Sequence, residues 1–324
     1  MRYLFRLLDG NSVATLNEAF SKLSVRRRYE VWFLRIGLAD GSGAWWLRYL
    51  LMNPGRSGCI AIPEAKPVQV WATWFPANMK PQSFIQGFPL EEFDLSHKGH
   101  APFRFQVGEN AIAEDFCRGA LNVDGHRIKW NLRYCSTFRV VLSSKGWIGF
   151  SRTPHSDAVF SGEITFDNRR FAGDPLGFGV QGHNSGYRHR NFWTWAHAYF
   201  PRTGQPASTL EALIYEMPLG LVFRKAVLWH DGQEYVFRNL KETGDPETMR
   251  WDFCCSLPNI IGVQATIDGR GPSVHRLPYI KTNCSGAFEV ANNSFASASL
   301  LLEEAHRPAT SLETVGGAVL EVVG

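Results

Sequence analysis

Apolar, β-branched and aromatic residues recur along most of this chain in short runs bounded by glycine-rich turns. Such runs are typical of β-strands. Glu30 to Ile36 and Ala44 to Leu51 flank the turn Asp40-Gly41-Ser42-Gly43, so we predict that they form a hairpin. A helical period is clearest over Ser12 to Leu23, where Ser12 can cap a short helix. The other strands predicted in the first half are 68–75, 103–107, 111–123 and 127–135.

The second half of the chain repeats this order of strands. Phe192 to Phe200 is a tryptophan-rich strand like Glu30 to Ile36, and Thr209 to Met217 parallels Ala44 to Leu51. Many short strands without alternating helices favour a barrel or a sandwich. We therefore predict an all-β fold of two tandem antiparallel barrels with a short N-terminal helix. The remaining predicted strands are 221–229, 233–239, 259–267, 276–282, 286–292, 294–302 and 317–323.

The composition agrees with a packed sheet protein that holds a ligand. Hydrophobic residues make up 44% of the 324 residues and aromatic residues 13%, including 23 Phe and 11 Trp. This aromatic content suits a cavity that receives a large apolar molecule or lipid. The net charge is +4 and the basic residues are scattered, so nucleic acid is not an expected partner.

The sequence also bears on location and redox state. No segment approaches the roughly 18 apolar residues of a membrane span. The apolar run within Met1 to Asp9 is broken too early for a signal peptide. We therefore expect a cytoplasmic protein that touches membranes, if at all, transiently and through its ligand. The six cysteines include no C-x-x-C pair, so we interpret them as reduced thiols.

No motif for a nucleotide cofactor or a serine hydrolase is present. The sequence has no G-x-G-x-x-G after a strand, no G-x-x-x-x-G-K-S/T and no G-x-S-x-G. His183, His189 and His197 do not have the spacing of a zinc site. We therefore expect neither a cofactor nor a metal.

The stretch from Ser151 to Phe200 is the richest in chemistry, because histidines, arginines and tryptophans lie there among glycines. Glycine lets a backbone pass close to other groups, so we interpret the stretch as a lining. In a strand over 192–200, alternation places four ring-bearing side chains on one face. That face either lines a cavity or packs the core or the seam between the barrels. The four residues are Trp193, Trp195, His197 and Tyr199.

His155, Asp157 and His183 are the candidates for acid–base catalysis. His155 and Asp157 are two residues apart, so on a strand they face the same way. A carboxylate beside an imidazole raises its pKa and suits it to proton transfer. The alternative is a hydrogen-bonded loop that closes the first barrel. His183 and Asn184, in a predicted loop or bulge, add donors and acceptors at short range.

Arg35 and Arg48 lie inside otherwise apolar strands, where an arginine needs a partner. One interpretation places their cations inside the cavity, opposite a ligand carboxylate or a developing anion. The other is a structural ion pair at a barrel end. The candidate acidic partners are Glu30, Glu114, Asp115 and Glu216.

These residues resemble the AttH-like group of lipocalin-like proteins. That group stands beside the carotenoid 1,2-hydratases, the tocopherol cyclases and a set of fungal Diels–Alderases. The resemblance extends from about Tyr29 to Gly324. It is carried by Tyr29 to Arg35, Trp46 to Tyr49, Gly182-His183-Asn184-x-Gly186, Trp193-x-Trp195-Ala196-His197, Leu277 to Thr282 and Phe288 to Asn293.

The resemblance implies two lipocalin-like (calycin) barrels over residues 1–188 and 189–324, with a hydrophobic ligand site in or between them and no cofactor. Members of the wider group carry or act on isoprenoids, polyenes and other lipids. Those that catalyse hold one conformer and place an acid near a double bond. In the hydratases a Tyr and an Asp precede the central Asn-x-Gly, and here Val180 and Gly182 stand in those places. The resemblance therefore supplies no proton donor, and the nearest replacements by type are His155, Asp157 and His183.

Three functions stay open. The first is binding of an isoprenoid, polyene or lipid. The second is a cofactor-independent cyclase, hydratase or isomerase that works by acid catalysis and conformer positioning. The third is a scaffold or interaction module with a filled interior, in which the Trp and His residues are absorbed in packing. The ligand-binding candidates are Trp193, Trp195, His197, Tyr199, Asn184, Arg35 and Arg48.

Overall fold

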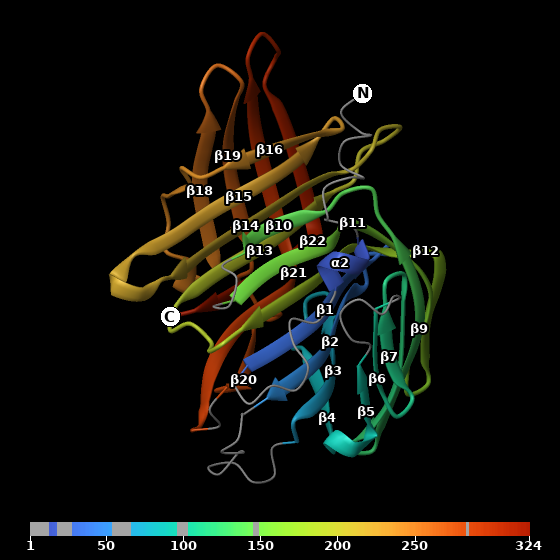
Figure 1. Cartoon of the computed structure of the whole chain (residues 1–324). Helices are drawn as coiled ribbons and strands as arrows, with labels where there is room; N and C mark the ends of the chain where they lie inside the picture. Colours follow the sequence, from blue (N-terminus) through green and yellow to red (C-terminus); the bar gives the residue numbers. More distant parts are fainter. Residues whose placement is uncertain (1–12, 18–27, 54–65, 96–102, 145–148, 283–284) are drawn as a thin grey trace.

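The computed structural model describes residues 13–17, 28–53, 66–95, 103–144, 149–282 and 285–324. These residues form two antiparallel sheets, which occupy the lower and the upper part of the molecule in Figure 1. The short helix α2 (Val13–Asn17) precedes them. The other residues of the helix predicted over Ser12 to Leu23 lie outside the described residues, so a helix of that length is not shown.

The first sheet has twelve strands within the described ranges, in the order β4-β3-β2-β1-β12-β11-β9-β8-β7-β6-β5, with β10 paired to β11. A hydrogen bond of 3.3 Å from Asn122 N to Gln86 Oε1 joins β8 to β4, so the sheet is nearly closed into a barrel. A 3-10 turn, η1 (Leu90–Glu92), precedes β5. The strands are β1 (Arg28–Leu38), β2 (Gly43–Asn53), β3 (Val68–Pro76), β4 (Gln82–Phe88), β5 (Phe93–Leu95), β6 (Arg104–Val107), β7 (Asn110–Ala113), β8 (Phe116–Val123), β9 (His126–Cys135), β10 (Val140–Ser144), β11 (Gly149–Phe166) and β12 (Arg169–Gly186).

The second sheet has ten strands in the part of the chain that the structure describes, in the order β16-β15-β14-β13-β22-β21-β19-β18-β17, with β20 paired to β21. Two 3-10 turns, η2 (Pro218–Gly220) and η3 (Pro246–Thr248), connect its strands. The strands are β13 (Trp193–Phe200), β14 (Ser208–Glu216), β15 (Val222–His230), β16 (Gln233–Phe237), β17 (Lys241–Glu242), β18 (Arg250–Leu257), β19 (Ile261–Asp268), β20 (His275–Ile280), β21 (Ala287–Glu304) and β22 (Thr310–Val323).

The two sheets repeat one topology. Strands β13, β14, β15 and β16 have the places of β1 to β4, and β22, β21, β19 and β18 have those of β12, β11, β9 and β8. The all-β fold with two tandem barrel-like sheets, predicted from the order of strands, is thereby confirmed. The division at residues 188 and 189 stays a prediction; the first sheet ends at Gly186 and the second begins at Trp193.

Several predicted strands have different bounds in the structure, and the predicted strand 317–323 is the end of β22, which begins at Thr310. The run 111–123 is split into β7 and β8 by the bend at Glu114 and Asp115. The runs 286–292 and 294–302 are one strand, β21, which carries a bulge after Asn293. The Asn293 carboxamide accepts the Phe295 backbone N–H at 2.8 Å, so a local side-chain bond replaces a ladder bond there.

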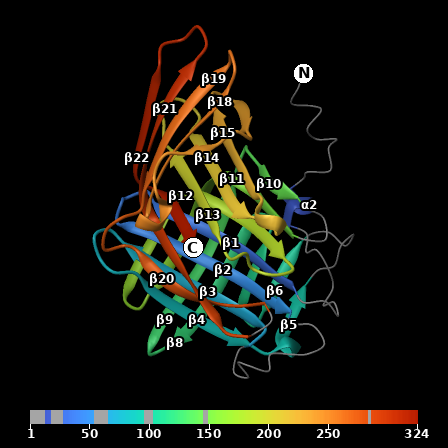
Figure 2. The ribbon, with the colours of Figure 1, turned by 90° about the vertical axis from the view of Figure 1, so that its left-hand side faces the viewer.

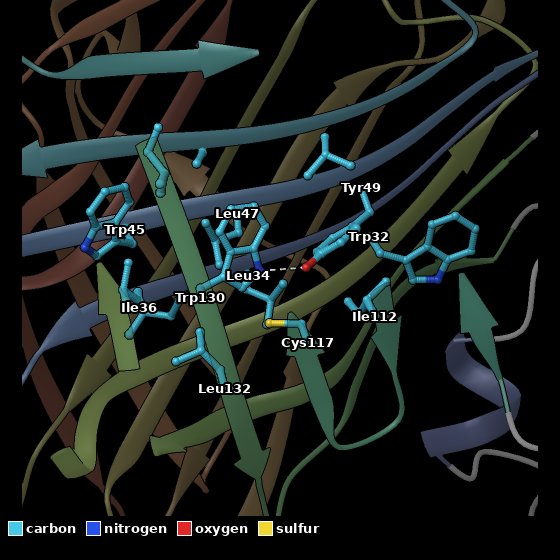
Figure 3. Packing of buried hydrophobic residues seen from close by; sticks show 14 of the residues in the cluster. Trp32, Leu34, Ile36, Trp45, Leu47, Tyr49, Ile112, Cys117, Trp130 and Leu132 are labelled. Carbon is cyan, nitrogen blue, oxygen red and sulfur yellow. Dashed lines mark hydrogen bonds between the residues drawn. The ribbon is translucent and has the colours of Figure 1, made fainter. Parts of the chain in front are cut away.

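The interior of each barrel is filled with side chains. In the first barrel Trp32, Trp45, Tyr49 and Trp130 pack together, as Figure 3 shows, and Trp130 Nε1 donates to the Tyr49 hydroxyl at 2.7 Å. The second barrel is packed in the same way around residues such as Trp251. Its core residues come from β13 to β16 and from β18, β19, β21 and β22. The interiors of the two barrels are therefore hydrophobic cores.

A third hydrophobic cluster lies between the barrels. Alternation along β1 sends Trp32 and Leu34 inward, and Phe33 and Arg35 outward to face the second sheet. Both faces of these strands are thus buried, which explains their nearly continuous apolar runs. Figure 2 shows the second sheet standing over β1 and β2, with β20 reaching down beside β3. Trp71 of β3 meets Tyr279 of β20 edge to face, with ring centroids 5.5 Å apart.

Within the residues that the structure describes, no helix has the length and apolar character needed to cross a membrane.

Candidate functional site

A pocket of about 130 Å³ lies in the seam between the two barrels. Aromatic and polar residues share its walls, and several of the rings pack against one another: Trp195 meets Phe33 at 5.4 Å and Trp46 at 6.0 Å between centroids. The pocket therefore suits a flat molecule that has an apolar body and some polar atoms. The rings in its walls are Tyr29 and Phe33 of β1, Trp46 of β2, Phe150 of β11, Trp193 and Trp195 of β13, Tyr215 of β14 and Tyr279 of β20.

Arg48 places a buried cation in this aromatic wall. It is 5% exposed, and its guanidinium carbon lies 4.2 Å from the ring centroid of Tyr279 and 4.7 Å from that of Trp71. Cation–π contacts of this kind stabilise a desolvated charge. One guanidinium nitrogen, Nη1, has no hydrogen-bond partner among the described residues. A buried donor without a partner is costly, so this atom is suited to a ligand acceptor.

Two further wall residues have buried polar atoms without a partner among the described residues. They are the indole Nε1 of Trp46, a donor, and the amide Oδ1 of Asn184, an acceptor. Together with Arg48 they give the pocket two donors and one acceptor. Polar atoms without a partner in the wall of a pocket are suited to orienting a small ligand.

The carboxylate of Glu321 holds the rings of this wall in place. It accepts hydrogen bonds from Trp193 Nε1 at 3.0 Å, from the Tyr279 hydroxyl at 3.1 Å and from Asn292 Nδ2 at 3.3 Å. Burial raises the pKa of Tyr279 well above its usual value, so its hydroxyl stays a donor. The bonds that Glu321 accepts fix two of the rings that enclose the ligand space.

Basic residues stand at the mouth of the pocket. Arg188, His189 and Arg190 belong to the connection between β12 and β13, and they also border a second, larger hollow of about 740 Å³. His189 stacks on Tyr29 at 4.1 Å between centroids, and the Arg190 guanidinium lies 5.4 Å from the Tyr215 ring. Arg188 and Arg190 therefore make the entrance cationic, whereas burial lowers the pKa of His189 to about 3 and keeps its ring neutral.

The predicted ligand-binding residues divide into two sets. Arg48, Asn184, Trp193 and Trp195 line the pocket. Tyr199 lies outside its walls, where it stacks on Phe178 at 5.2 Å. The alternation predicted for β13 explains this division, because the face that carries Trp193 to Tyr199 runs along the whole seam and the pocket occupies only one part of it.

The structure does not bring His155 and Asp157 together. The His155 ring nitrogens contact Ser136 Oγ and the Glu114 carbonyl, both at 2.7 Å. Asp157 instead accepts the backbone N–H groups of Thr137 and Phe138. The register of β11 shifts on both sides of His155, so simple alternation does not apply there. Burial lowers the pKa of His155 to about 4, and neither residue belongs to the pocket wall.

His183 and Arg35 also lie outside the pocket wall. His183 is in β12 rather than in a loop; it stacks on Trp32 at 4.4 Å, and its Nδ1 lies 2.9 Å from the Leu16 carbonyl of α2. Arg35 has no ion pair with the predicted acidic residues. Its guanidinium donates to backbone carbonyls: Ser294 at 3.0 Å, Gly316, and Phe178 at 3.4 Å. Arg35 therefore joins the first barrel to the second.

Three residues that the sequence analysis did not single out are important here. Tyr279 and Glu321 belong to the pocket wall, and Glu211 is buried directly behind it. Each of the two glutamates is the lone carboxylate in an apolar run of the sequence, Glu211 in Leu210 to Tyr215 and Glu321 in Ala318 to Val323. This pattern could have pointed to them. A buried carboxylate needs donors, so such a position indicates a polar network.

Gly182 supports the pocket through its missing side chain. It pairs with Phe33, whose ring covers it, and a Cβ on Gly182 would lie 2.2 Å from Phe33 Cζ. Gly182→Ala is therefore expected to displace a pocket ring and to lower the free energy of unfolding by about 1–3 kcal/mol. Urea unfolding measures this, with Gly262→Ala as the matched strand control, since its nearest atom is Glu303 Oε2 at 3.4 Å. Equal losses in both variants would contradict the explanation.

Comparison with known proteins gives a resemblance in fold. No protein-family model matches the sequence, and no curated protein matches it either. Kievitone hydratase from Nectria haematococca has a similar structure, with a TM-score of 0.57, 13% identity, and coverage of 95% of this chain and 91% of that one. The protein CghA, in its complex with Sch210972, has a TM-score of 0.60, 11% identity, and coverage of 92% and 88%.

A putative AttH from Nitrosomonas europaea is also similar, with a TM-score of 0.51, 13% identity, and coverage of 92% of both chains. Identities this low show the fold and not the reaction. The chain therefore has the tandem lipocalin-like fold of the AttH-like group, as the resemblance of its motifs implied. The structural neighbours include a hydratase and a protein solved with a bound small molecule.

Proposed function

We propose that the protein binds a flat, mostly apolar small molecule, such as an isoprenoid or polyene, in the seam pocket. An acceptor oxygen of the ligand faces Arg48. The observation that carries the proposal is the unpartnered Nη1 of Arg48, a buried cation enclosed by the rings of Trp71 and Tyr279. A ligand oxygen there would satisfy the donor, and the aromatic walls would bury the rest of the molecule.

The fold comparison supports small-molecule binding in general terms. The names of two of the similar structures include those of small molecules, kievitone and Sch210972. The scaffold interpretation finds support in the filled barrel interiors, but it gives no account of the unpartnered polar atoms in the seam. Binding is therefore the function that the geometry favours.

Two fluorescent probes that differ in charge test the proposal. The first, 1-anilinonaphthalene-8-sulfonate, joins apolar rings to an anion, and the second, N-phenyl-1-naphthylamine, has similar rings without a charge. Arg48→Met is expected to weaken binding of the anionic probe at least about tenfold, since a buried charge-assisted bond is lost. Binding of the neutral probe is expected to change by less than about threefold, because Met keeps the apolar volume.

Arg133→Met is the matched control, because the Arg133 side chain is 78% exposed and lies far along β9. It is expected to leave both affinities unchanged. The proposal is overturned if Arg48→Met and Arg133→Met bind the anionic probe equally well, or if the wild-type protein binds neither probe.

A further inference from the structure

A layer of buried polar side chains lies directly below the inner end of the seam pocket. Trp195 of β13 and Leu213 of β14 line the pocket and are paired across the two strands. Two residues further along, His197 and Glu211 are the next pair on the same face. Glu211 is 1% exposed and His197 is fully buried. The pair thus lies about 7 Å below the pocket wall, the rise of two strand residues.

Glu211 uses only one of its two carboxyl oxygens. Its Oε1 accepts a hydrogen bond of 2.7 Å from Thr153 Oγ1, which reaches across from β11, and one of 3.0 Å from Trp195 Nε1. Its Oε2 has no hydrogen-bond partner in the described part of the chain. Because Oε1 already accepts two donors, a proton bound to this carboxyl group belongs on Oε2.

His197 presents the complementary atom. Its Nε2 lies 2.7 Å from the Ser156 carbonyl, which can only accept, so Nε2 carries the ring proton. Its Nδ1 is then an acceptor with a free lone pair, and it too lacks a partner among the described residues. A donor on Glu211 Oε2 and an acceptor on His197 Nδ1 therefore occur on directly opposed residues, and the structure leaves both atoms unsatisfied.

The electrostatics of the layer favour a neutral pair. Burial raises the pKa of Glu211 to about 7, against the lowering effect of its two hydrogen bonds. Burial lowers the pKa of His197 to about 3, so its imidazole is neutral at physiological pH. The charged groups that face the pair are Lys225 of β15 and Arg35 of β1, and both donate to backbone carbonyls. Neither cation is placed to take the Glu211 proton.

We propose that Glu211 and His197 form a proton-sharing pair behind the wall of the seam pocket, in which one water bridges the proton on Glu211 Oε2 to His197 Nδ1. Neither residue lines the pocket, so the pair does not contact a bound ligand. It is coupled to the pocket through Trp195, whose ring lines the pocket and whose Nε1 donates to Glu211 Oε1.

The inference rests on the proposed function, because the coupling requires a ligand in the pocket. His155, Asp157 and His183 also lie outside the pocket wall, but the hydrogen bonds described above join them to residues outside that wall, whereas Glu211 accepts a hydrogen bond from Trp195 of the wall. A purely structural role for Glu211 would require only the bond to Trp195. It would not explain why the opposed atoms Oε2 and Nδ1 are both left free.

Infrared difference spectroscopy between pH 5.5 and 8.5 tests the pair. The C=O stretching band of a protonated carboxyl group is expected to titrate with a midpoint near 7 in the wild-type protein. The band is expected to disappear in Glu211→Gln and to stay in Glu216→Gln, which alters a half-buried glutamate of the same strand. Saturation with N-phenyl-1-naphthylamine is expected to raise the midpoint by about one pH unit, because an apolar ligand excludes water from the pair.

Each outcome of the infrared experiment bears on a different part of the proposal. Absence of a titrating band in the wild-type protein overturns the pair without any need for a folded variant. A band that persists in Glu211→Gln assigns the proton elsewhere and also overturns it. A band that titrates but ignores a bound probe shows that the pair does not serve the pocket. Failure of the probe to bind at all overturns the proposed function instead, so the two failures are distinguishable.

Discussion

The protein is expected to lose about 9 kcal/mol of its free energy of unfolding between pH 7 and pH 4. Burial lowers the pKa of His155 to about 4 and those of His183, His189 and His197 to about 3, all below the ordinary value of 6.5. Between pH 6.5 and these values the unfolded chain binds more protons than the folded one, so stability falls as the pH falls. Each of these histidines then costs about 3 kcal/mol at pH 4.

Glu211 acts in the opposite direction. Its pKa is raised to about 7 in the folded protein, so the folded state binds the extra proton between the ordinary value of 4.5 and 7. This offsets about 3 kcal/mol of the loss on acidification. The net loss is comparable to the whole stability of an ordinary domain, so acid unfolding above pH 4 is expected.

Urea unfolding at several pH values measures the effect. His155→Gln is expected to reduce the pH dependence by about a third, since about 3 kcal/mol of the net loss of about 9 kcal/mol is removed. His306→Gln, at an exposed turn, is the matched control and is expected to leave the pH dependence unchanged. A stability that stays constant from pH 7 to pH 4.5 would show that the buried histidines are not held neutral.

Arg35→Met is expected to lower the free energy of unfolding by about 3–5 kcal/mol and to separate the unfolding of the two barrels. The fully buried guanidinium donates to the Ser294 and Gly316 carbonyls of the second sheet and to the Phe178 carbonyl of the first. Removal of the donor leaves these buried acceptors without partners, which costs more than the desolvation of the cation returns.

The measurement is unfolding followed by two probes, calorimetry and tryptophan fluorescence. In Arg35→Met the two transitions are expected to diverge, whereas Arg133→Met at an exposed position is expected to match the wild type. Arg35→Lys, which keeps the charge but not the planar fork, is expected to lose an intermediate amount. A loss below about 1 kcal/mol in Arg35→Met would show that water replaces the guanidinium in the seam.

The fold could be predicted from the sequence because its signals are local. Runs of apolar and β-branched residues, turns such as Asp124-Gly125 and the recurrence of one strand order all act within short segments. Some strand bounds differ where a side chain intervenes, as Asn293 does in β21, and others differ in length, as β22 begins at Thr310 rather than at 317. The nearly continuous apolar runs of β1 to β3 indicate that both faces of these strands are buried. They do not indicate which sheet covers the outer face.

The site could be predicted only in part, because it depends on contacts between distant strands. Alternation along β13 correctly placed Trp193 and Trp195 on one face, but only the second sheet decides which part of that face is hollow. For His155 and Asp157 alternation was a poor guide, since bulges in β11 change the register. The glycines of 151–200 were interpreted as places of close approach; at Gly182 the approaching group is the protein's own Phe33 ring.

The connection between β12 and β13 is the chain's covalent passage from one barrel to the other, and Arg188, His189 and Arg190 within it also border the entrance of the pocket. Any movement of one barrel against the other therefore moves the rim of the entrance. A molecule bound in the pocket as proposed would restrain that movement, and the stiffness of the seam would in return set how quickly the molecule escapes. Substitutions in this connection should consequently change residence time more than affinity, so dissociation rates are where its influence will be seen.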